Sequence, residues 1–95
     1  MTPVRWTRPA LRHLQDIGLH IARDDPRAAL SVVTRIRAAP DRLGTLPHAG
    51  REGRVANTRE LVVVGLPYIV VYRIDAQAVT VLAVMHTARL WPRRF

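Results

Sequence analysis

The sequence predicts an α+β fold in which a helical hairpin packs on one face of a small, mainly antiparallel four-stranded sheet. The spacing of apolar residues changes near residue 50, from a helical period before it to short β-branched runs after it. No repeat or low-complexity tract divides the 95 residues, a length typical of one domain. We therefore expect a single domain over residues 1–95 with the element order β-α-α-β-β-β.

Two helices are expected in the first half, after a short strand over residues 3–6. Apolar side chains at helical spacing predict the first helix over residues 8–23. Gly18 inside it costs about 1 kcal/mol relative to alanine, which suggests close packing at that point. Asp25 can cap a second helix, and Pro40 should kink or break it because proline removes a ladder hydrogen bond.

The second half is expected to begin with an irregular basic loop over residues 47–57. Dense β-branched residues separated by short turns then predict an antiparallel meander. Its three strands are expected over residues 61–64, 68–74 and 79–85.

The charge of the chain points to a polyanionic partner. The formal net charge is +8, and the sequence contains no lysine, so every basic residue is an arginine. Arginine pairs well with phosphates and carboxylates, so the partner could be nucleic acid, a ribosome or an acidic protein segment. The alternative is a basic surface that serves only to keep the protein solvated.

Composition excludes several classes of site. Without cysteine there is no disulfide, thiolate metal site or thiol nucleophile. The four histidines do not have zinc-ligand spacing, and no carboxylate pair or phosphate-binding glycine loop stands out. We expect no metal and no cofactor. With no secretory signal and no apolar run of membrane length, we expect a soluble, cytoplasmic protein without a membrane partner.

The last predicted strand leads into the most informative pair of residues, His86 and Arg89. A histidine at a strand end with an arginine three positions later places a titratable group beside a cation. Such a pair could bind phosphate or transfer a proton, so both are candidate catalytic residues. The alternative is a histidine that caps the strand and an arginine that is a surface charge.

Further candidates for binding a target or nucleic acid are mostly arginines. Arg51 and Arg54 lie in the expected loop, where they could contact phosphates. Arg59 could form a cationic patch with Arg73 or Arg89, or it could form an ion pair with Glu60 or across the sheet. Trp91 could stack on a base, or it could be a packing anchor against the first helix.

Three segments, in this order and spacing, resemble the RelE/ParE superfamily of type II toxin–antitoxin toxins, and the match covers nearly the whole chain. The segments are Gly-Arg-Glu-Gly-Arg at 50–54, Thr-Arg-Glu-Leu-Val-Val at 58–63 with Pro-Tyr-Ile-Val-Val-Tyr-Arg at 67–73, and Val-Met-His-Thr-Ala-Arg at 84–89 with Trp-Pro at 91–92. The resemblance implies an antitoxin whose C-terminal segment wraps and neutralises the toxin in a hetero-oligomer. The expected antitoxin contacts are Leu14, Ile17, Ile21 and Arg59.

The resemblance is closer to ParE-like members, which poison DNA gyrase without a catalytic site. RelE-like members cut mRNA on the ribosome with basic groups on the sheet, including an arginine after the tyrosine that opens the central strand. Here Ile69 follows Tyr68, Glu60 and Val62 replace further basic residues, and no C-terminal tyrosine follows. A gyrase inhibitor is therefore expected. The alternatives are a ribosome-dependent endoribonuclease that uses His86, and a non-toxic interaction module whose induction would not arrest growth, so enzymatic activity stays open.

Overall fold

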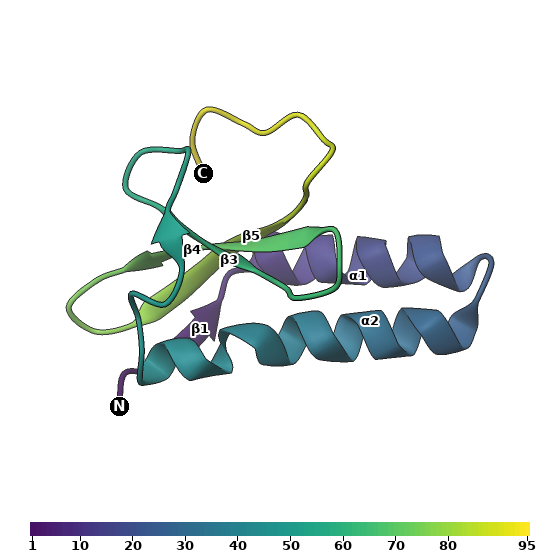
Figure 1. Cartoon of the computed structure of the whole chain (residues 1–95), viewed down its shortest axis with the longest axis horizontal. Helices are drawn as coiled ribbons and strands as arrows, with labels where there is room; N and C mark the ends of the chain where they lie inside the picture. The colour runs from purple at the N-terminus through teal and green to yellow at the C-terminus, as the bar shows by residue number, and fades with distance from the viewer.

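The computed structural model describes residues 1–95 as two layers, with two helices beneath one face of a twisted sheet (Figure 1). The elements are β1 (Val4–Trp6), α1 (Arg8–Ala22), α2 (Pro26–Ala38), the 3₁₀ helix η1 (Ala39–Gly44), β2 (Arg51–Glu52), β3 (Arg59–Val62), β4 (Tyr68–Ile74) and β5 (Val79–His86). The predicted α+β architecture is confirmed. None of the helices is long and apolar enough to cross a membrane.

The sheet has five strands in the order β1-β5-β4-β3-β2, so the predicted count of four is wrong. β1 runs parallel to β5, and the other neighbours are antiparallel. The extra strand, β2, lies within the segment expected to be a loop. Arg51 and Glu52 pair there with Glu60 and Arg59 of β3. A strand of two exposed residues carries no alternation of apolar side chains, so periodicity could not reveal it.

Local hydrogen bonds explain where the helices begin and end. The side chains of Thr7 and Asp25 accept hydrogen bonds from backbone N–H groups in the first turns of α1 and α2. α2 ends at Ala38, and the chain tightens into η1 around the buried Pro40, which confirms the expected break. Arg37 near the end of α2 lies over the ring of Trp6, with Cζ 4.6 Å from the ring centroid.

The hairpin packs tightly at the one glycine of α1. A Cβ added to Gly18 would lie 2.9 Å from Cγ2 of Val33 in α2, so the close packing inferred from this glycine is present. Above the hairpin, apolar side chains of both helices and of the sheet form one core. Its largest fully buried members are Tyr72, Ile36, Leu43, Val70, Val79 and Val81.

The opposite face of the sheet is covered by the C-terminal segment, which runs back over it in yellow (Figure 1). A second, smaller apolar cluster lies there, made of Ile69, Val71 and Ala83, with Met85 and Trp91 packed against it. Burial on both faces explains why the middle strand, β4, is apolar at nearly every position.

A bulge in β5 changes which side chains face the helices. Tyr72 pairs with Val81 while Val71 pairs with Ala83, so Leu82 is an extra residue in β5. Val79 and Val81 contact the helix-side core before the bulge, whereas Val84 does so after it. The bulge therefore turns the last part of β5, including His86, towards α1.

Candidate functional site

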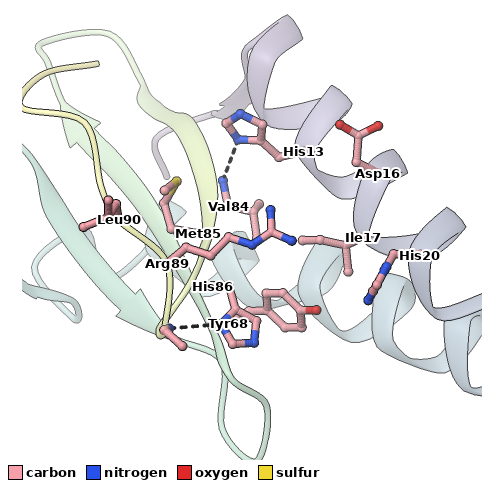
Figure 2. Close-up of a pocket in the computed structure, with 11 residues that line it drawn as sticks. His13, Asp16, Ile17, His20, Tyr68, Val84, Met85, His86, Arg89 and Leu90 are labelled. Carbon is pink, nitrogen blue, oxygen red and sulfur yellow. Dashed lines mark hydrogen bonds between the residues drawn. The ribbon is translucent and has the colours of Figure 1, made fainter.

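The end of β5 and the middle of α1 enclose a pocket of about 480 Å³ (Figure 2). The pocket combines apolar walls with a group of histidines, one arginine and one aspartate. Its lining residues are His13, Asp16, Ile17, His20, Tyr68, Val84, Met85, His86, Ala88, Arg89 and Leu90. His86 and Arg89, the two residues singled out from the sequence, therefore lie in one cavity.

His86 is the last residue of β5, and its ring is fixed by two contacts. It lies edge-on against Tyr68, with ring centroids 5.3 Å apart and an interplanar angle of 89°. Its Nδ1 accepts a hydrogen bond from the Ala88 N–H at 3.0 Å. A neutral imidazole with an accepting Nδ1 carries its proton on Nε2, so His86 has one free N–H donor. The histidine thus both closes the turn after the strand and contributes a polar group to the pocket.

Arg89 extends from the turn after β5 across Val84 towards Ile17 of α1 (Figure 2). No carboxylate lies within 4 Å of its guanidinium. The two salt bridges of the molecule join Glu60 to Arg51 and Arg54 and do not involve Arg89. An unpaired guanidinium offers a planar fork of N–H donors that matches a carboxylate or a phosphate.

His13 of α1 joins the pocket although the sequence did not single it out. Its Nδ1 accepts the Val84 N–H at 3.2 Å, on the edge of β5 beyond the end of β1. Burial, together with the nearby Arg12, lowers the pKa of His13 against the opposing effect of Asp16. Helical spacing places residues 13, 17 and 20 on one face of α1, and this was the signal that could have identified it.

Arg51 and Arg54 do not reach this pocket, because both bind the carboxylate of Glu60. Arg51 donates from Nη2 to Oε1 at 2.9 Å, and Arg54 donates its backbone N–H to Oε2 at 2.8 Å and Nε–H at 3.1 Å. The Glu60 side chain is only 2% exposed. Burial disfavours its charge, but the hydrogen bonds from Arg54 and Arg51 outweigh burial and lower the pKa of Glu60.

Trp91 is held by the same cluster, on the face of the sheet away from the helices. The guanidinium carbon of Arg54 lies 3.5 Å from the centroid of the indole ring. The indole N–H donates to the carbonyl of His86 at 3.4 Å. Trp91 is thus a packing anchor, as the alternative interpretation held, but it packs on the sheet and not on the first helix.

The arginines of the expected sheet patch do not converge. Arg59 donates from Nη2 to the Gly50 carbonyl at 2.6 Å, and it forms no ion pair with Glu60. Arg73 is exposed near one end of β4, whereas Tyr68, which pairs with His86, lies at the other end. Arg73 is five positions along the strand from Tyr68, a distance of roughly 17 Å, so Arg73 lies far from the pocket of Arg89.

Residues 4–91 match the family model described as the ParE toxin of type II toxin-antitoxin system, parDE. The chain belongs to the ParE toxin family. It is 50% identical over 90 residues to Y4kP of Sinorhizobium fredii, a protein named as a candidate toxin, with 95% of this chain and 93% of Y4kP covered. It is 38% identical over 90 residues to toxin RelE2 of Caulobacter vibrioides, covering 95% of this chain and all of RelE2.

A solved structure of the chromosomal ParDE toxin–antitoxin system from P. aeruginosa has the same fold as this ParE-family chain. The TM-score is 0.82 with 26% sequence identity, over 90% of this chain and 96% of that chain. The resemblance to RelE/ParE toxins is therefore confirmed. The protein is a type II toxin–antitoxin toxin, and an antitoxin is its partner.

The residues expected to contact the antitoxin of this ParE-family toxin differ in accessibility. Leu14 is 6% exposed and belongs to the core, so it offers little surface to a partner. Ile17 is half-buried and lines the pocket, and Ile21 is half-buried near the end of α1.

No group of three or more histidine, aspartate or glutamate side chains is placed to hold a metal ion.

Proposed function

We propose that this ParE-family toxin binds DNA gyrase and inhibits it, and that the cognate antitoxin neutralises it. Gyrase acts on the chromosome, so the proposal places the toxin in the cytoplasm. The observation that carries the proposal is the set of side chains on the sheet face opposite the helices, the face on which RelE-like nucleases carry basic groups. In this chain the face holds a buried isoleucine and a buried, fully paired glutamate.

Ile69, which follows Tyr68, is 2% exposed and lies under Trp91. Glu60 is an acid where a base would be needed, and it already binds Arg51 and Arg54. Cleavage of a phosphodiester requires a base, an acid and a cation aimed at the developing charge. A face with these groups absent or already paired favours a toxin that acts by binding.

The exposed C-terminal segment offers a surface for such binding. Leu90 is 99% exposed and Phe95 is 42% exposed, and Arg93 and Arg94 between them are exposed cations. Aromatic and arginine side chains are enriched at protein interfaces, and this segment ends with Arg93, Arg94 and Phe95. We infer that this segment contributes to the contact with gyrase.

The test is the supercoiling of relaxed plasmid by gyrase and ATP in the presence of purified, folded toxin. We expect inhibition or trapped cleaved DNA at micromolar toxin, with heat-unfolded toxin as the inactive control. In cells, pulse-labelling after induction should show DNA synthesis stopping before protein synthesis. Full supercoiling activity at micromolar folded toxin would contradict the proposal.

One observation favours a second candidate, a ribosome-dependent mRNA endoribonuclease. His86, Tyr68 and Arg89 line the same pocket and together provide a titratable group, a hydroxyl and a cation. In that case mRNA cuts at defined codon positions should appear in translating extracts and vanish in His86→Ala and Arg89→Ala. The absence of cuts with wild-type toxin would exclude this candidate.

A further inference from the structure

We propose that the pocket between α1 and β5 receives a glutamate or aspartate side chain from an apolar segment of the antitoxin, and that this carboxylate pairs with Arg89. The proposal uses the antitoxin partner of the family and does not depend on gyrase as the target. It gives the antitoxin one specific anchor point, defined by a guanidinium, a small group of polar donors and an apolar wall.

The unpaired guanidinium in the pocket can accept an anion from outside the chain. Arg89 points into the cavity, and no carboxylate of the toxin lies within 4 Å of it. The one acidic lining residue, Asp16, makes no salt bridge with any group. In a protein of net charge +8, an incoming carboxylate gains a bidentate partner and meets a favourable overall potential.

The shape and lining of the pocket suit a peptide side chain with apolar neighbours. A volume of about 480 Å³ holds a few side chains. Ile17, Val84 and Leu90 provide apolar contact beside Arg89. Leu90 is almost fully exposed in the free toxin, so a bound apolar residue would remove it from water.

Polar donors on two walls can complete the coordination of one carboxylate. His86 keeps a free Nε2–H because its Nδ1 is occupied by Ala88. His20 of α1 lies on the opposite wall, one turn beyond Ile17 (Figure 2). A carboxylate has two oxygens and accepts about four hydrogen bonds, which Arg89 and these histidines can supply.

Asp16 favours a carboxylate over a phosphate as the occupant. A phosphate group carries up to two negative charges, so the Asp16 carboxylate on the pocket wall repels it more strongly than it repels a singly charged carboxylate. The large apolar share of the lining also fits a peptide better than a polynucleotide backbone, which needs a continuous basic track.

The test is an NMR titration of ¹⁵N-labelled, full-length toxin with three probes. These are the capped tripeptide acetyl-Leu-Glu-Leu-amide, its acetyl-Leu-Gln-Leu-amide match and inorganic phosphate, each up to 50 mM. We expect the glutamate peptide to shift the Arg89 Nε–H and the His20 and His86 ring signals. We expect its affinity to be at least tenfold higher than that of the glutamine peptide or phosphate.

Two variants identify the anchor. Arg89→Gln should reduce the affinity for the glutamate peptide at least tenfold, whereas Arg93→Gln removes an equal charge from the exposed tail and should leave it unchanged. The backbone spectrum of each variant confirms that it is folded. Equal binding of the two peptides, tighter binding of phosphate, no binding by 50 mM, or equal loss in both variants would each overturn the proposal.

Discussion

Replacing Glu60 with glutamine should destabilise the toxin, even though the two arginines that bind Glu60 are partly exposed to solvent. The substitution preserves the shape of the side chain but removes the charge that Arg51 and Arg54 bind. Loss of one partner from a buried ion pair costs about 3–5 kcal/mol. Glu60 is 2% exposed, but the two arginines are 56% and 45% exposed and can be rehydrated. The amide oxygen also keeps one acceptor, so we expect a loss of about 2–3 kcal/mol at pH 7.

For a domain of this size, such a loss lowers the melting temperature by roughly 10–20 °C. The assay is urea unfolding followed by circular dichroism, with Glu52→Gln as the control. Glu52 is an exposed residue of β2, and its replacement changes the net charge equally. We expect the control to change stability by less than about 0.5 kcal/mol.

The pH dependence gives a second measure of the same cluster. The pKa of Glu60 in the folded protein lies below 4.5, so the folded state binds fewer protons than the unfolded state in this range. Its contribution is therefore complete above pH 4.5 and is lost as the pH falls through the lowered pKa. The difference in the free energy of unfolding between wild type and Glu60→Gln should therefore become smaller on acidification to pH 3. A gap that stays constant with pH, or a Glu60→Gln protein as stable as the control, would refute the reasoning.

Three further predictions concern the core and the pocket. Burial holds the pKa of His13 below 6.5, so its contribution to stability is present above pH 6.5 and is lost as the pH falls; His13→Asn should flatten the decline in unfolding free energy between pH 7 and pH 5. In a Val33→Ala background, which makes room for the new methyl group, Gly18→Ala should raise the free energy of unfolding by about 1 kcal/mol relative to Val33→Ala alone. In the wild-type background it should not, and a double-mutant cycle measures the difference. Tyr72→Phe should cost about 1–3 kcal/mol in urea unfolding, because the hydroxyl accepts the buried Gly50 N–H; an unchanged midpoint would contradict this.

The sequence predicted the helices and long strands well because their signals are local. Caps, apolar periodicity and β-branched runs depend on neighbours within a few residues, and β4 (Tyr68–Ile74) has the bounds expected from them. The Leu82 bulge and the β2 pairing depend on residues distant in the chain, so periodicity could not reveal them. The direction of His86 follows from the bulge, and for that reason its pocket could not be placed in advance.

One side-chain pairing considered from the sequence, between Arg59 and Glu60, is wrong. Adjacent residues of a strand point to opposite faces, so Arg59 and Glu60 could not form the ion pair considered from the sequence. Glu60 instead binds Arg51 of β2 and Arg54, which follows that strand. Arg73 is separated from Arg89 by distance, because Arg73 lies near one end of β4 and the pocket of Arg89 lies at the other end.

The two tryptophans lie in different parts of the molecule, and each stacks under an arginine from another segment. Trp6 pairs with Arg37 where β1 meets α2, and Trp91 pairs with Arg54 where the tail meets the sheet. Each indole is therefore a separate fluorescence reporter: one follows docking of the hairpin, and the other follows detachment of the tail. Versions with a single tryptophan would show whether the tail opens while the rest of the toxin remains folded, a local motion that one averaged signal would hide.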